Sequence, residues 1–216
     1  MNNLFNYDGK FVSSVNKTID AFVLGFFWLI CSVPVFTAGA ASAAFYYAFH
    51  KSVRLGSSYP IKEFFRGFKS NFKQATVLWL ILMFLALVLC LDLYILTSDV
   101  LQIGMLQPFL IVTSFLILAI CTMWGLCAFP YMSRFACTMK DVLKNSFIVT
   151  LANLHWALLL LILFAGAVAI FFTVPVLSLL TPAIYMFLAN RILERVFQRH
   201  MRPEDLKAQR EAEAQA

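Results

Sequence analysis

Long apolar runs, separated by short segments that carry nearly all of the charge, are the dominant pattern of this chain. A helix needs about 20 apolar residues to cross the ~30 Å hydrocarbon core of a membrane. By that criterion, four spans are predicted after residue 74, at Ala75–Leu96, Phe109–Phe129, Phe147–Phe172 and Val176–Asn190. The last two are divided at Thr173–Val176, because one unbroken helix would be about 66 Å long.

The first apolar stretch, Ile19–Phe49, is interrupted by Pro34 and Gly39. Proline lacks a backbone donor and breaks or kinks a helix, and glycine weakens one. Two arrangements fit this pattern: a single kinked span, or a re-entrant pair of half-helices. With this stretch counted once, we expect about five transmembrane helices.

Composition places the chain in the membrane class. Of its 216 residues, 62% are hydrophobic and 13% are charged, whereas ordinary globular proteins are roughly 45–50% apolar and about 25% charged. A soluble enzyme, a disordered chain and a disulfide scaffold are therefore disfavoured. We expect an all-α polytopic membrane protein, with an integral membrane domain over residues 1–195 and a polar cytoplasmic tail over residues 196–216.

Charge placement predicts which connections face the cytoplasm. Lys51–Lys73 holds six basic residues and one acidic residue, Glu63, whereas the next connection carries Asp92 and Asp99 and no Lys or Arg. Because cytoplasmic loops are enriched in Lys and Arg, we expect Lys51–Lys73 and the basic C-terminal tail to be cytoplasmic. The basic residues lie in separate segments between the apolar runs and do not form the basic face of a soluble nucleic-acid-binding domain. Nucleic acid is therefore not an expected partner.

The orientation of the N-terminus rests on a short internal similarity. Val33–Val35 and Val174–Val176 are both Val-Pro-Val and both follow aromatic residues. If the two segments share an orientation, the first stretch runs from outside to inside. We therefore expect a multi-pass membrane protein with an external N-terminus.

The segment around Pro34 is the first candidate functional region. Pro34, Thr37, Gly39, Ser42 and Tyr46 lie within or beside a run of small residues. Small residues let membrane helices approach closely, so one interpretation is a packing surface. The alternative is a broken helix whose freed backbone groups and hydroxyls line a polar substrate pocket, as in transporters.

Aromatic and basic residues alternate in the segment that follows His50. On a helix, Phe65, Phe68 and Phe72 share one face, which predicts an amphipathic cytoplasmic helix at the level of the lipid headgroups. The helix either anchors to the bilayer or docks onto the cytoplasmic surface of a partner. The residues expected to dock are Phe65, Arg66, Phe68, Lys69 and Asn71.

Polar residues inside membrane spans are costly and often functional. Asn153 and His155 are the candidates here, because His155 is expected about two turns inside the span that begins at Phe147. The simpler interpretation is an interfacial histidine packed under Trp156. The sequence has no GxSxG, HExxH or Walker A motif, so we expect no enzymatic activity, no catalytic residues, no cofactor and no metal.

Three separated segments of this chain resemble the YesL-like family of small polytopic membrane proteins. They are Leu29–Tyr47 (LICSVPVFTAGAASAAFYY), Phe64–Gln74 (FFRGFKSNFKQ), and Pro130–Phe135 together with Lys144–Ser146. The resemblance covers nearly the whole chain and implies a protein of mainly Gram-positive bacteria, without an assigned biochemical activity. It also implies an association with carbohydrate ABC importers, because members tend to be encoded beside them.

Two functional hypotheses follow. In the first, the protein is an accessory or regulatory subunit of a carbohydrate uptake system, in contact with the bilayer and with ABC importer permease or ATPase subunits. In the second, it is a stand-alone transporter of a sugar or another small solute, with its site at the broken first helix. A water-accessible cavity lined by Thr37, Ser42 and Tyr46 favours the transporter, and a dry packed core favours the accessory subunit.

The charge pattern makes a prediction about topology. In a cysteine-free background, a cysteine at Ser57 should not react with a membrane-impermeant maleimide in intact cells, because the basic loop is expected inside. A cysteine at Ser98 should react. Gel-shift labelling before and after permeabilisation measures both positions, and the opposite labelling pattern would contradict the inside and outside assignments.

Overall fold

The structure is a computed structural model, and it describes residues 10–54, 59–98, 104, 106–135, 138–174 and 180–199. The regular elements within these ranges are all helical, which confirms the all-α class. In chain order the α-helices are α1 (Lys10–Ser32), α2 (Ala38–Phe49), α3 (Pro60–Thr97), α4 (Leu106–Arg134), α5 (Met139–Ala152), α6 (Leu154–Thr173) and α7 (Thr181–Gln198). A 3-10 turn, η1 (Val35–Thr37), precedes α2, and a π-helical turn, η2 (His50–Arg54), follows it.

Four of these helices, α1, α3, α4 and α6, are long and apolar enough to cross a membrane. The chain is therefore a polytopic helical membrane protein, with one candidate span fewer than expected among the described residues. The expected span that is not among these four is Val176–Asn190. Residues 175–179 lie outside the described part, and α7 carries three charged residues in its second half, Arg191, Glu194 and Arg195.

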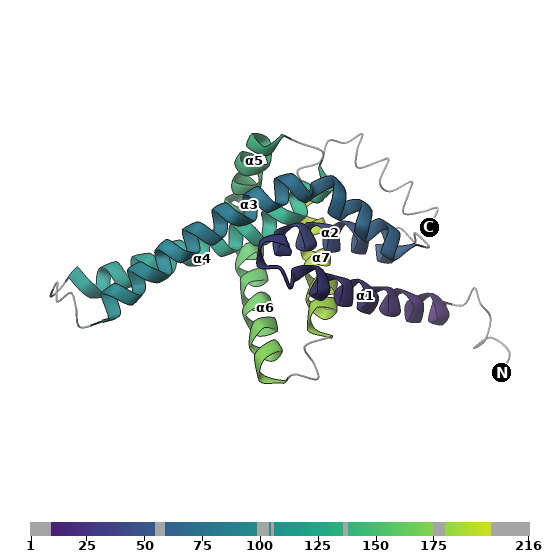
Figure 1. Ribbon diagram of the computed structural model, residues 1–216, viewed down its shortest axis with the longest axis horizontal. Helices are drawn as coiled ribbons and strands as arrows, with labels where there is room; N and C mark the ends of the chain where they lie inside the picture. The colour runs from purple at the N-terminus through teal and green to yellow at the C-terminus, as the bar shows by residue number, and fades with distance from the viewer. Residues whose placement is uncertain are drawn as a thin grey trace.

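The break after the first apolar helix is at Pro34, as predicted, whereas Gly39 lies inside α2. The Thr37 hydroxyl lies 2.6 Å from the Cys31 carbonyl oxygen and 2.7 Å from that of Pro34, and shares its one hydrogen between them. It thereby reaches the Cys31 carbonyl, an acceptor that the end of α1 leaves free. Helices α1 and α2 then pack as an antiparallel hairpin (Figure 1). The stretch is therefore two antiparallel helices and not a single kinked span, and α1 by itself is long enough to cross a membrane.

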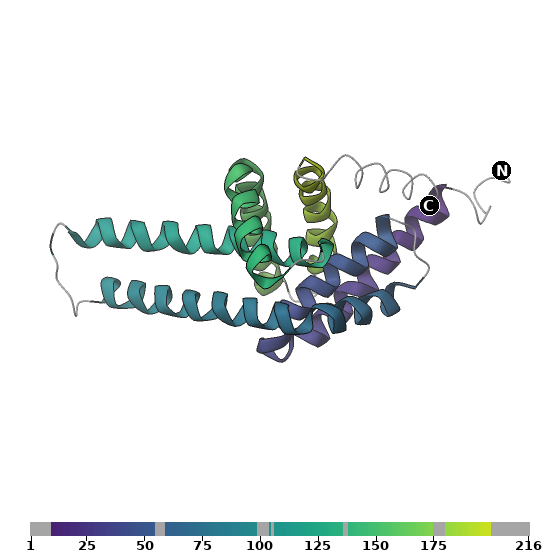
Figure 2. The same ribbon diagram turned by 90° about the horizontal axis from the view of Figure 1, so that it is seen from above.

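Helix α3 combines two elements that were expected to be separate. It contains 38 residues and is about 57 Å long at 1.5 Å per residue. The amphipathic loop helix and the second span are therefore continuous, because no proline separates Pro60 from Thr97. Helices α3 and α4 lie side by side as a long arm in both views (Figures 1 and 2).

The expected span Phe147–Phe172 is not one helix, because Asn153 interrupts it. The Asn153 backbone nitrogen and side-chain amide both donate to the Val149 carbonyl oxygen, at 3.1 and 3.0 Å. The Asn153 carbonyl oxygen accepts hydrogen bonds from the backbone nitrogens of Trp156 and Ala157, in the first turn of the next helix. Helix α5 ends at this corner, and α6 begins at Leu154 and runs steeply across the α3–α4 arm (Figure 1).

Two further boundaries differ from expectation. Helix α4 continues past Phe129 to Arg134 with Pro130 inside its last turns. Helix α7 continues to Gln198, and Phe197 is buried. The expected domain boundary after residue 195 therefore falls inside α7.

The small side chains of α2 bring it into close contact with α3 and α4. Ala40 and Ala43 are fully buried and pack in one cluster with Ala75 and Leu78 of α3. A Cβ atom built at Gly39 would lie 2.5 Å from the Trp79 Cβ and 2.8 Å from the Ala75 carbonyl oxygen. Only a glycine fits at this contact, which is the packing geometry that small residues allow in membranes.

This contact predicts opposite effects for two glycine substitutions. Gly39→Ala should destabilise the protein by about 1–3 kcal/mol, the usual cost of overpacking a core. Gly166→Ala on α6 meets open space and should be neutral or stabilising by up to about 1 kcal/mol, because alanine is the better helix former. Thermal unfolding in detergent compares the two variants, and equal effects would show that the α2–α3 contact does not limit stability.

Candidate functional site

A buried carboxylate of α7 gathers polar groups from three other segments. Glu194 of α7 is 1% exposed, and its Oε1 accepts a hydrogen bond from the Tyr46 hydroxyl of α2 at 2.8 Å. His50 Nδ1 of η2 and Arg134 Nε of α4 lie 3.1 and 3.5 Å from the same oxygen. The Tyr46 and His50 rings are nearly parallel, with centroids 6.4 Å apart. We call these four residues the Glu194 cluster.

The helical register of α7 places Glu194 inside the bundle. Met186, Asn190, Leu193 and Phe197 are buried on the same helix, three or four residues apart around Glu194. A buried carboxylate is costly unless it is paired and hydrogen-bonded. The Arg134 guanidinium, at the end of α4, supplies the positive charge of this pair.

Sequence analysis did not identify Glu194 as a candidate, and it placed Tyr46 in a substrate segment. The Glu194 neighbours Arg191 and Arg195 give this part of the sequence a charged character. The sequence signal for burial of Glu194 is its helical spacing. Asn190 and Glu194 lie on the same helix face as the apolar residues Met186, Leu193 and Phe197. A polar residue inside an apolar stripe indicates a buried, paired group.

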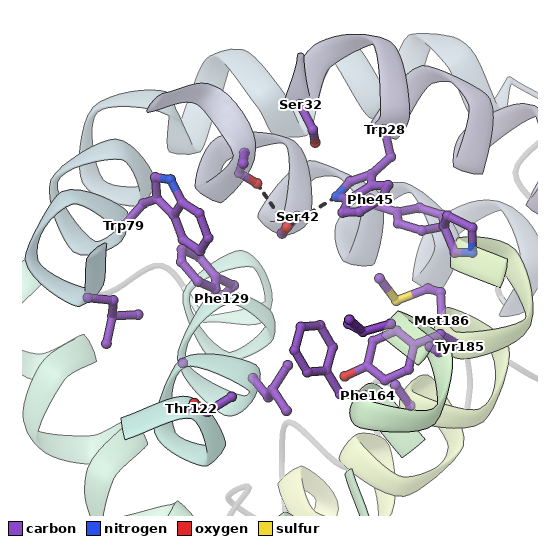
Figure 3. Close-up of a pocket in the computed structure, with 18 of the residues that line it drawn as sticks. Trp28, Ser32, Ser42, Phe45, Trp79, Thr122, Phe129, Phe164, Tyr185 and Met186 are labelled. Atoms are coloured by element: carbon purple, nitrogen blue, oxygen red, sulfur yellow. Dashed lines mark hydrogen bonds between the residues drawn. The ribbon is translucent and has the colours of Figure 1, made fainter. Parts of the chain in front are cut away.

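A partly enclosed cavity of about 540 Å³ lies at the junction of the α1–α2 hairpin, the α3–α4 arm, α6 and α7 (Figure 3). Its walls are mostly aromatic and aliphatic. The described residues that line it include no Lys, Arg, His, Asp, Glu, Asn or Gln. The Ser42 hydroxyl lines the cavity, but it accepts from Trp28 Nε1 and donates to the Ala38 carbonyl oxygen, at 3.1 and 2.8 Å.

The structure does not bring the five residues around Pro34 into one pocket. Ser42 lines the cavity, whereas Thr37 closes the end of α1 and Gly39 faces Trp79. Tyr46 belongs to the Glu194 cluster, and Pro34 is exposed at the break. A water-accessible cavity lined jointly by Thr37, Ser42 and Tyr46 is therefore not formed by these side chains.

The amphipathic part of α3 packs on the core through a face that contains Phe64 and Gly67. Phe64, not Phe65, is fully buried. Gly67 follows it on the same face, where a Cβ would lie 2.8 Å from the Tyr47 ring. Phe68 is half-buried and stacks on Phe64 with ring centroids 6.3 Å apart. Exposure of Phe65 and burial of Phe64 follow from how α3 rotates against α2, which periodicity within α3 alone does not determine.

Several expected docking residues remain accessible on α3. Phe65, Arg66 and Lys69 are exposed, and Asn71 donates to the Gly67 carbonyl oxygen at 3.0 Å. Together with their exposed neighbours they form what we call the basic-aromatic surface: Tyr59, Lys62, Phe65, Arg66, Lys69, Phe72 and Lys73.

An ion-pair group lies at the edge of the basic-aromatic surface. Glu63 lies 3.4 Å from Lys51 Nζ and 3.6 Å from Arg66 Nη1. A hydrogen bond with Tyr47 and the nearby Glu63 carboxylate raise the pKa of Lys51. Lys51 is therefore cationic at neutral pH and keeps Glu63 paired.

The two polar candidates of the fourth span lie at a helix boundary. Asn153 is buried at the α5–α6 corner. His155 is exposed in the first turn of α6, with its ring centroid 5.2 Å from that of Trp156. The expected depth of two turns was wrong because the span begins at Leu154, not at Phe147, whereas the expected contact with Trp156 is present.

Comparison with known families gives one match. Residues 21–93 match the model of a family described as a protein of unknown function, DUF624. This is the YesL-like family, and the matched region contains Leu29–Tyr47 and Phe64–Gln74, two of the segments that carry the resemblance. No curated protein and no solved structure matches the chain. The match covers the second half of α1, all of α2 and most of α3, and it attaches no activity to them.

The Glu194 cluster predicts a large effect of removing one charge. Glu194→Gln should destabilise the protein by about 3–5 kcal/mol, because it leaves a buried charge without its partner. Glu63→Gln is the matched control and should cost about 0–1 kcal/mol, since its cationic partners are much more exposed. Denaturant unfolding in detergent measures both. Similar small losses would show that the Glu194 cluster contributes little to stability.

Proposed function

We propose that this protein is a non-enzymatic accessory or regulatory subunit that associates with a carbohydrate ABC importer through the basic-aromatic surface of α3. The observation that supports it best is the character of that surface. All seven of its residues are exposed, four are cationic and three are aromatic. Aromatic and arginine side chains are enriched in protein interfaces, and the positive charge fits an acidic partner surface.

The basic-aromatic surface is held by the packing beneath it. Phe64 is buried under it, and Gly67 lies against Tyr47 of α2. The Phe65 ring contacts the rings of Phe27 and Phe64 edge-on, with centroids 5.6 and 5.7 Å apart. A surface whose side chains are already positioned loses less conformational entropy when it binds.

The chemistry of the cavity supports an accessory role over sugar transport. A sugar presents several hydroxyl groups, and each loses hydrogen bonds to water unless the site replaces them. The lining described above is apolar, and the hydroxyls of Ser42 and Thr122 already donate to backbone carbonyls. Among the described lining residues the Ser32 hydroxyl is buried without a hydrogen-bond partner. The lining offers no charged or amide side chain, however, to bind the several hydroxyl groups of a sugar.

The importer itself enters the proposal through the family resemblance, which associates members with carbohydrate ABC systems. The enrichment of Lys and Arg supports a cytoplasmic position for the basic-aromatic surface, where it would meet a permease loop or an ATPase subunit. The resemblance does not distinguish between these two partners.

The basic-aromatic surface can be tested by substitution. Phe65→Ala and Arg66→Ala should each lower co-purification with the importer subunits from native membranes by tenfold or more, because interface anchors often contribute ~2 kcal/mol or more. Phe84→Ala, at an exposed phenylalanine in the apolar half of α3, is the matched control and should have no effect. Phe68 is unsuitable for this test because it packs against the core.

Quantitative mass spectrometry of the purified complexes measures the effect, and membrane insertion is followed in parallel. Normal co-purification of both variants would overturn the docking role. If only simultaneous neutralisation of several basic residues has an effect, the surface is a lipid anchor.

A further inference from the structure

We propose that the cavity described above is a binding site for a single acyl chain of a bilayer phospholipid. The site is independent of the docking surface on α3. It is formed where the α1–α2 hairpin meets the α3–α4 arm and α6 (Figure 3).

The position of the cavity makes the bilayer its immediate surroundings. Its lining comes in large part from α1, α3, α4 and α6, the four helices that are apolar and long enough to span a membrane. Met83 of α3 and Val168 and Phe172 of α6 line the cavity and are also exposed, at 40%, 38% and 78%. They mark an opening between the α3–α4 arm and α6, through which a chain enters from the hydrocarbon.

The lining selects an apolar occupant. Apolar cavities of this kind are not stably filled by water, which needs two to four polar partners. An empty cavity forfeits the dispersion contacts of its walls. An alkyl chain restores those contacts, and the aromatic walls of Trp28, Trp79 and Phe129 offer flat surfaces for it.

Charge chemistry favours a phospholipid chain over a free fatty acid. A fatty acid carries a carboxylate that needs a cation or several donors when it leaves water. The described lining provides no Lys, Arg or His. In a phospholipid the acyl chain is linked through an uncharged ester, and the charged headgroup stays at the membrane surface.

The dimensions fit one chain. A volume of about 540 Å³ falls within the roughly 300–1,000 Å³ of typical ligand pockets. A second hollow of about 440 Å³ shares Trp28, Ser32 and Phe171 with the first and extends it along α1. The Ser32 hydroxyl oxygen at this junction is buried and has no hydrogen-bond partner, so it is available to the ester of an entering chain.

The tryptophans of the cavity wall provide a direct probe. The chain has four tryptophans, and replacing Trp124 and Trp156 by phenylalanine leaves only Trp28 and Trp79, both in the wall. This variant is placed in nanodiscs of phosphatidylcholine brominated at the middle of its acyl chains. We expect strong quenching of the tryptophan emission relative to nanodiscs of the unbrominated lipid.

Filling the cavity distinguishes a bound chain from lipid that merely surrounds the protein. In the same background, Ala167→Phe on the α6 wall should lose most of the quenching. Ala169→Phe is the matched control, since Ala169 is exposed on α6 and does not line the cavity. It should keep the quenching. Ala86→Phe fills the cavity from α3 and decides the result if Ala167→Phe does not fold.

Two results would overturn the proposal. One is equal quenching in the filled and control variants, which would assign the effect to surrounding lipid. The other comes from native mass spectrometry of the unaltered protein, which requires no substitution. We expect one retained phospholipid after release from detergent, and a protein that carries none would rule out the site.

Discussion

The close approach of α2 to its neighbours is the constraint on which the rest of the structure depends. Gly39 admits the Trp79 side chain at a distance where no other residue fits, and Trp79 Nε1 in turn donates to the Val35 carbonyl oxygen at 2.7 Å. The Trp79 side chain therefore packs against α2 and is hydrogen-bonded to the backbone between α1 and α2. Because α2 contacts α1, α3, α4 and α7, its position sets theirs.

The Glu194 cluster is a consequence of that position. With α2 seated between α1 and α3, its C-terminal end carries Tyr46 and His50 to α7, where Glu194 accepts from Tyr46. Arg134 reaches the same oxygen from the end of α4. The small side chains set the distance between the helices. The buried Glu194 fixes the register of α7, because a shift of α7 along its axis would leave the carboxylate unpaired in an apolar interior.

Function is best understood from the contrast between the inside of the molecule and the surface of α3. The interior cavity is apolar and suits a lipid chain more than a sugar, whereas the basic-aromatic surface is charged, exposed and firmly supported by Phe64 and Gly67. These two features fit the proposed role, in which a membrane protein is recognised by a partner through α3. Helix α3 links the two features, since it forms the surface in one half and a cavity wall in the other.

The sequence by itself determined the membrane class, the helical content, the break at Pro34 and the apolar cores of α3 and α4, because composition and periodicity are local properties. It did not determine the α5–α6 corner, since Asn153 stands in an apolar run and ends α5 through its non-helical backbone conformation, with φ −124° and ψ 42°. Nor did it determine that Phe64 is buried while Phe65 is exposed, or that Glu194 is paired. Those outcomes depend on contacts between helices far apart in the chain, and only the tertiary structure decides which face of each helix they cover.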